Sequence, residues 1–122
     1  MPALSFSANI SADTQTALQS QYATLSARIQ AAPTRVDAWL ELGIVYKIAG
    51  DYSAAVTAWS YVGKAAPASV AAVAYGNLGD LYLNFTHEYA KAAQSYQAAL
   101  RLNPGYADYT AGLKAAQQAQ AK

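Results

Sequence analysis

The fold is decided by the stretch Trp39-Leu40-Glu41-Leu42-Gly43-Ile44-Val45-Tyr46, which returns in altered form as Tyr75-Gly76-Asn77-Leu78-Gly79-Asp80-Leu81-Tyr82. Both stretches begin with an aromatic residue, continue with a Leu-Gly pair and end with a tyrosine. Residues at spacings of three, four and seven lie on one face of an α-helix. Each stretch therefore predicts a helix that buries rings and one glycine on the same face.

A second helix pattern follows each stretch, in residues 50–56 and in residues 87–93. Both patterns place a tyrosine before small residues, and each continues to a further aromatic residue, Trp59 or Tyr96, and then to a proline. A proline inside a helix removes a hydrogen bond and clashes with the preceding turn. The prolines therefore mark where each second helix ends, and the chain predicts two helix hairpins.

This order of residues resembles the tetratricopeptide repeat (TPR), most fully over residues 36–69 and again over residues 72–106. The resemblance implies stacked antiparallel hairpins, in which glycine and alanine let helices approach closely and aromatic rings fill the gaps. The residues that carry it are Trp39, Leu42, Gly43, Tyr46, Ala55, Trp59 and Pro67 in the first copy and Tyr75, Leu78, Gly79, Tyr82, Ala92, Tyr96, Ala99 and Pro104 in the second.

The spacing of the prolines supports this register, because Pro33 and Pro67 are 34 residues apart, the period of the family. The second copy is three residues longer. We place two of the extra residues, Val70 and Ala71, in the link between repeats and one in the turn at residues 83–88. On this interpretation all three lie outside helix interiors.

The flanks are expected to cap the repeats, because the end repeats of a solenoid cannot leave their apolar faces in water. Residues 12–33 predict an N-terminal capping helix and residues 107–122 a C-terminal one, after a flexible segment at residues 1–11. Thr34 and Asp37 have the spacing of a capping box at the start of the first repeat. The predicted fold is an all-α TPR-type solenoid of about six helices, with residues 12–122 as a single domain.

Composition excludes several classes of partner. The chain has 122 residues, 54% of them hydrophobic and 12% charged, with a net charge of +1 and no cysteine. That charge is too small to recruit nucleic acid, and the absence of cysteine excludes disulfides and thiolate metal sites. No stretch reaches the roughly 18 apolar residues of a membrane span. We expect a soluble chain, in the cytoplasm in preference to an extracytoplasmic location reached through a removed leader or anchor.

The TPR resemblance implies a concave groove lined by the first helix of each hairpin. The lining is mainly aliphatic. TPR proteins that clamp a peptide carboxylate have a lysine and a first asparagine where this chain has Leu40 and Ile44, and only Asn77 agrees with their pattern. We therefore expect a protein or peptide ligand with apolar anchors. The predicted lining residues are Asp37, Leu40, Ile44, Lys47 and Ile48 from the first copy and Val73, Gly76, Asp80, Leu83 and Asn84 from the second.

No pattern of catalytic residues is recognisable. The sequence contains neither an evident nucleophile with its base nor a phosphate-binding loop, and its one histidine, His87, has no metal-ligand spacing. We therefore predict a chain that is not an enzyme and needs no cofactor or metal. The alternative hypothesis from another class is a structural module whose groove or terminal helices mediate homo-oligomerisation.

Overall fold

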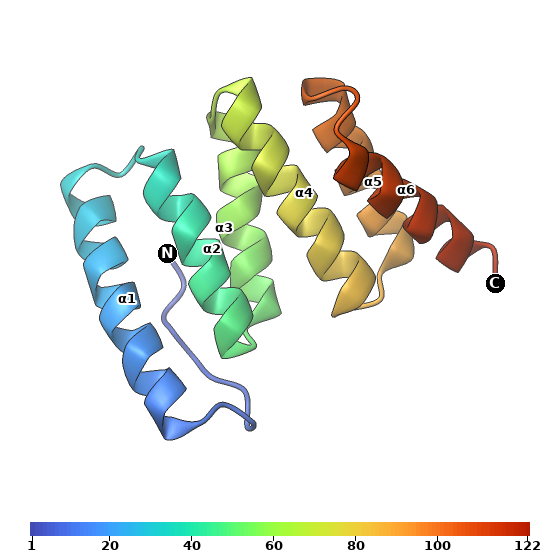
Figure 1. The fold of residues 1–122 in the computed structure, drawn as a ribbon. Helices are drawn as coiled ribbons and strands as arrows, with labels where there is room; N and C mark the ends of the chain where they lie inside the picture. The colour runs from blue at the N-terminus through green and yellow to red at the C-terminus, as the bar shows by residue number, and fades with distance from the viewer. The chain divides into compact units, whose positions relative to one another are not determined.

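The structure, a computed structural model, describes all of residues 1–122 and contains six α-helices and no strand (Figure 1). About three quarters of the residues are helical, so the all-α prediction is confirmed. The helices are α1 (Ala12–Ala31), α2 (Val36–Ala49), α3 (Tyr52–Ala65), α4 (Ala68–Asn84), α5 (Tyr89–Leu102) and α6 (Ala107–Gln120). None of them is long and apolar enough to cross a membrane.

The chain divides into two compact units, Met1–Tyr61 and Val62–Lys122, and the division falls within α3. Each unit is described by itself below. The single domain expected for residues 12–122 stays a prediction.

In the first unit, α1 packs along α2. Leu18, Leu25 and Ile29 follow one another at spacings of seven and four residues and are buried, so α1 presents one apolar stripe. Ser11 caps the start of this helix, because its hydroxyl oxygen accepts a hydrogen bond from the Thr14 backbone N–H at 3.2 Å. A helix is therefore present where the N-terminal capping helix was predicted, and its capping role stays a prediction.

The contact between α2 and α3 is built from a glycine and a ring. A Cβ atom added to Gly43 would lie 2.1 Å from Nε1 of Trp59, so the indole rests directly on the α2 backbone. Trp59 is 1% exposed, and its indole N–H donates to the Leu40 carbonyl oxygen at 3.0 Å. This contact confirms that the glycine of the repeat pattern permits close approach of the two helices.

A tight corner joins α2 to α3. Gly50 has φ 85°, in the left-handed region that favours glycine, and its backbone N–H bonds to carbonyls of the last turn of α2. Asp51 then caps α3, because its Oδ1 accepts from the Ala54 backbone N–H at 3.2 Å. The Gly-Asp pair thus ends one helix and begins the next within two residues.

The second unit contains α4, α5 and α6, in which α5 packs against both neighbours. Tyr96 lies between two glycines, because a Cβ on Gly79 of α4 or on Gly112 of α6 would come within 2.7 Å of its ring. The ring is 1% exposed, and its hydroxyl donates to Asp80. Burial is the main reason that the pKa of Tyr96 is raised, so this phenol remains a hydrogen-bond donor.

Two local predictions are wrong. The capping box at Thr34 and Asp37 does not form: α2 begins after Arg35, with no side-chain bond at its cap, because the Asp37 carboxylate pairs with the Arg35 guanidinium instead. Val70 and Ala71 do not lengthen a link, because they lie inside α4. Pro67 immediately precedes this helix, where its missing N–H and fixed φ are tolerated, and the alanine-rich residues after it favour helix.

The N-terminal segment contacts the first unit at several points. The Ser7 backbone N–H donates to the Ala49 carbonyl oxygen at 2.9 Å, and the Ser5 hydroxyl donates to Oδ2 of Asp51 at 2.9 Å. Figure 1 shows residues 1–11 as a long stretch without helix beside α1 and α2. The expectation of a flexible segment did not include these contacts.

Candidate functional site

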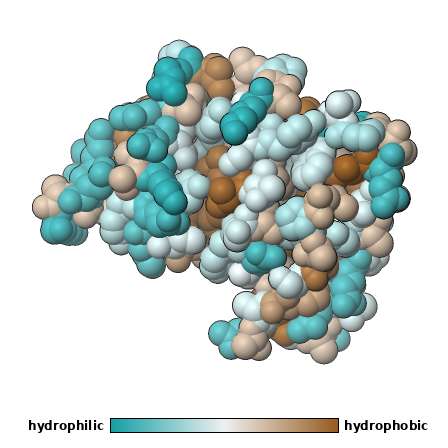
Figure 2. All heavy atoms as spheres, turned by 180° about the vertical axis from the view of Figure 1, so that it is seen from behind, coloured by the Kyte–Doolittle hydropathy of each residue, from teal (hydrophilic) through white to brown (hydrophobic).

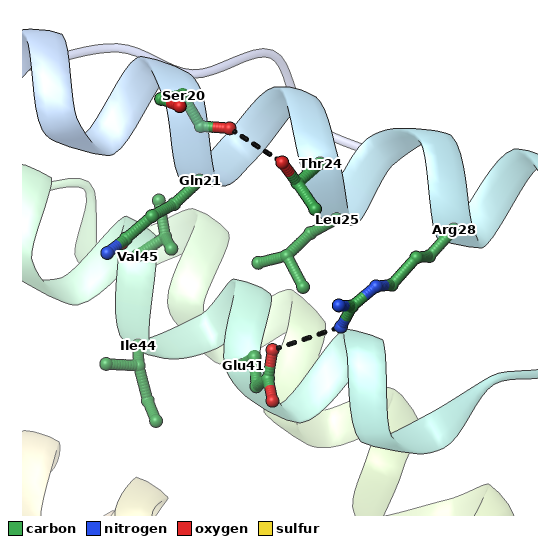
Figure 3. Close-up of a pocket in the computed structure, with 8 residues that line it drawn as sticks. All are labelled: Ser20, Gln21, Thr24, Leu25, Arg28, Glu41, Ile44 and Val45. Atoms are coloured by element: carbon green, nitrogen blue, oxygen red, sulfur yellow. Dashed lines mark hydrogen bonds and ion pairs between the residues drawn. The ribbon is translucent and has the colours of Figure 1, made fainter.

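A hollow of about 380 Å³ lies between α1 and α2 in the first unit (Figure 3). Both helices contribute to it, so its walls belong to regular secondary structure. The lining residues are Ser20, Gln21, Thr24, Leu25, Arg28, Glu41, Ile44 and Val45.

The hollow has an apolar floor and a polar rim. Leu25 and Val45 are buried, whereas Ile44 is 44% exposed and offers its side chain to a ligand. Arg28 and Glu41 point toward each other across the space between the helices, with 3.7 Å between Nη1 and Oε2. Both side chains are about half exposed, so the pair contributes little to stability and remains able to turn toward polar groups of a ligand.

The rim on α1 is made of short polar side chains. Thr24 donates its hydroxyl hydrogen to the Ser20 carbonyl oxygen at 3.2 Å, within the same helix (Figure 3). Gln21 and Ser20 are exposed. These groups can accept or donate hydrogen bonds, but no pair of them forms an acid and a base in contact.

The predicted residues on α2 differ in their exposure. Ile44 is 44% exposed and Ile48, one turn further on, is 48% exposed, while Leu40 and Lys47 are half-buried and Asp37 is exposed. Only Ile44 lines the hollow. An exposed pair of isoleucines at positions i and i+4 is the spacing by which a helix presents two apolar anchors.

The predicted residues on α4 are less available. Gly76 is buried, because the Tyr109 ring of α6 lies 2.4 Å from where its Cβ would be. Leu83 packs against the buried cluster around Tyr96. Val73, Asp80 and Asn84 are exposed, although Asp80 already accepts the bond from Tyr96.

The α2 residues belong to the first unit and the α4 residues to the second. A groove formed by both sets together stays a prediction. Sequence reasoning missed the α1 side of the hollow, although a signal was present, because Ser20, Thr24 and Arg28 follow one another at helical spacing on a polar face.

Large apolar side chains are exposed on both units. Figure 2 shows the face seen from behind, on which hydrophobic residues form separate spots among hydrophilic and intermediate ones. The large apolar residues that remain exposed are Met1, Ile44, Ile48, Val73, Phe85, Leu102 and Tyr106. Among these, Ile44 and Ile48 lie on one helix, and Ile44 lines the hollow.

The charge pair next to this face is a measurable feature. Asp37 accepts from Arg35 at 3.0 and 2.7 Å, and these side-chain hydrogen bonds are the main reason that its pKa is lowered to about 2. Since the pKa is lowered on folding, the pair stabilises the native chain above the unfolded-state value of about 3.9. That contribution is lost as the pH falls through about 2.

We therefore expect NMR titration of the Asp37 carboxyl to have its midpoint near pH 2. Arg35→Gln should raise the midpoint, whereas Arg28→Gln, at a residue that pairs with Glu41, should leave it unchanged. An ordinary midpoint in the unmodified chain would show that the Arg35–Asp37 pair does not form in solution.

Comparison with known proteins adds no relative. No protein-family model matches the chain, and no curated protein matches it. The resemblance to the TPR family therefore depends on the repeat residues of the chain itself.

Proposed function

We propose that the chain is a TPR-type protein-interaction module that binds an apolar peptide or helix of another protein along α2. The observation that carries the proposal is the pair of exposed isoleucines on α2, Ile44 and Ile48, the first of which lines a hollow with an apolar floor. Isolated exposed apolar residues are common on protein surfaces, but two on one helical face next to a cavity indicate a contact surface.

The shape of the hollow favours a side chain of a peptide as the group that enters. Its volume of about 380 Å³ is at the lower end of ligand pockets. One or two aliphatic or aromatic side chains would contact Leu25 and Val45, while Arg28 and Glu41 bind polar groups at the mouth. A helix laid on such a surface would place its anchors at positions i and i+4 or i+7.

The test is selection of binding peptides from a displayed library on the full chain, followed by measurement of their affinity for variants. Ile44→Asp with Ile48→Asp should weaken binding at least about 10-fold, because each side chain loses an apolar contact worth about 1.5–3 kcal/mol when fully buried. Helicity should not change, since both side chains are exposed in the free chain.

Leu102→Asp is the matched control, because Leu102 is also an exposed aliphatic residue but lies at the end of α5. It should leave the affinity unchanged. If the α2 double variant binds the selected peptides as tightly as the original chain does, the α2 surface is not the binding site.

Self-association is the second candidate function. The same isoleucines are the residues that a second copy of the chain would cover. Light scattering over a range of concentrations separates the two functions. A mass that grows with concentration and returns to that of a monomer in the Ile44→Asp, Ile48→Asp variant would favour an oligomerising module.

A further inference from the structure

Residues 1–10, which we call the strap, run along the first unit with alternate side chains turned inward. Pro2, Leu4 and Phe6 are half-buried, whereas Ala3, Ser5 and Ser7 are exposed. Burial of every second side chain is the pattern of an extended chain with one face on a surface. The strap thus lies on the helices as an extended peptide.

Two tyrosine hydroxyls hold the first part of the strap. Tyr22 of α1 and Tyr46 of α2 both donate to the Pro2 carbonyl oxygen. Tyr46 is completely buried, and burial is the first cause of its raised pKa, so its hydroxyl stays protonated as a donor. The two helices thus present a pair of donors to one backbone carbonyl.

The corner between α2 and α3 holds the second part. The Ser7 backbone N–H donates to the Ala49 carbonyl oxygen at 2.9 Å. That carbonyl belongs to the last turn of α2, where no helical N–H follows to pair with it. The Ser7 side chain lies 2.3 Å from where a Cβ on Gly50 would be, so the absence of a side chain there leaves room for the strap.

Three of the anchors, the Tyr22 and Tyr46 hydroxyls and the Ala49 carbonyl, recognise the backbone of the strap and not its side chains. Any peptide carries a carbonyl like that of Pro2 and, proline apart, an N–H like that of Ser7, so selectivity would come mainly from the inward residues Pro2, Leu4 and Phe6. The strap contains no charged side chain. The surface it covers therefore suits an uncharged extended peptide with an apolar residue at every second position.

We propose that this surface, the strap cleft, is a second peptide-binding site, filled in cis by the strap and open to a partner's extended peptide with apolar residues at alternate positions. The inward side chains of the strap are only half-buried, and three of the anchoring bonds use one carbonyl and one N–H of the strap. Such a segment opens locally at a small cost in free energy.

The strap cleft is separate from the hollow between α1 and α2. Its anchors are Tyr22, Tyr46, Ala49 and Asp51, and none of these lines the hollow. Peptide binding in the strap cleft should therefore be unchanged in the Ile44→Asp, Ile48→Asp variant. This variant separates failure of the strap-cleft proposal from failure of the proposal that α2 binds a peptide.

The test uses a fluorescently labelled decapeptide with the sequence of residues 1–10 as the probe. The full chain carrying Leu4→Asp and Phe6→Asp should bind the probe at one site, and at least about 10-fold more tightly than the unmodified chain does. In the unmodified chain the native strap competes with the probe, because its short tether gives it an effective concentration near millimolar. A control peptide with the same two substitutions should not bind. Equal affinity of both chains for the probe, or no binding to the variant, would overturn the proposal.

A second arm guards against misfolding of that variant. A protease site inserted at the exposed turn of Ala8 and Asn9 allows the strap to be cut after the chain has folded. The cut strap should dissociate on dilution while helicity is retained, and the probe should then refill the cleft. A cut strap that stays bound at nanomolar concentration would overturn the proposal. A dimer of uncut chains that the probe does not dissociate would also overturn it, because the strap of a second copy would then occupy the cleft.

Discussion

Trp59→Ala should lower the free energy of unfolding by about 3–5 kcal/mol, the usual loss when a buried tryptophan is truncated. Trp59 is among the largest fully buried side chains of the molecule, and its indole covers the backbone of α2 at Gly43. Truncation would leave a cavity over this glycine and remove the hydrogen bond from the indole N–H to the Leu40 carbonyl oxygen. Urea unfolding followed by far-UV circular dichroism measures the loss.

Trp39→Ala is the matched control for this experiment. Trp39 is only half-buried, with its ring 5.1 Å from that of Tyr61 and its indole N–H donating to the Pro33 carbonyl oxygen at 3.1 Å. Its truncation should destabilise the chain clearly less than that of Trp59. Equal losses for the two variants would contradict the difference in burial on which the core of the first unit depends.

Gly43→Ala should also destabilise the chain, although helix propensity alone predicts the opposite sign. Alanine is more favourable than glycine inside a helix by about 1 kcal/mol. Here, however, the new Cβ would lie 2.1 Å from Nε1 and 2.5 Å from Cδ1 of a ring that is itself buried. Overpacking of this kind costs about 1–3 kcal/mol, and occasionally more, so we expect a net loss in the midpoint of urea unfolding.

Ala111→Gly, at an exposed position within α6, is the control that measures the effect of helix propensity alone. That variant should lose up to about 1 kcal/mol without any change in packing. A double-mutant cycle of Gly43→Ala with Trp59→Leu should then show strong coupling, because a smaller side chain at position 59 relieves the clash. A stabilised Gly43→Ala variant would mean that the two helices are further apart than described.

The helices could be predicted from the sequence because their determinants are local. Spacing of apolar residues placed the first helix of each hairpin, and the prolines at 67 and 104 marked the ends of the second helices. Close approach of the hairpin helices was predicted at Gly43 and Gly79, and in the structure these glycines lie against the rings of Trp59 and Tyr96, a pairing that the sequence pattern did not specify. Membership of the TPR family stays a prediction.

Features that depend on distant residues could not be predicted in the same way. Gly76 was assigned to a binding surface because its helical position suggested it, but a tyrosine more than thirty residues later, Tyr109, covers it. The capping box failed because a neighbouring arginine competes for the same carboxylate. For Gly76 the partner comes from a distant part of the chain, whereas for Asp37 it is an arginine only two residues away.

In the candidate site, too, local features could be predicted and features that depend on distant residues could not. Ile44 and Ile48 were predicted as contact residues and are exposed, because helical spacing alone separates them from the buried face of α2. The α1 side of the hollow and the contacts of the strap arise from packing between segments that lie well apart in the chain. Alternation of apolar and small residues at Pro2, Leu4 and Phe6 was the one local signal for the strap.

Both tryptophans of the chain, Trp39 and Trp59, lie within Met1–Tyr61, and the second unit has none. Intrinsic fluorescence excited at the red edge of absorption therefore responds to one half of the molecule, while far-UV dichroism averages over all six helices. Recorded on a single denaturation series, the two signals would tell whether the halves melt as one cooperative body or in succession. No label or added chromophore is required, because the two native tryptophans serve as the fluorescent reporters.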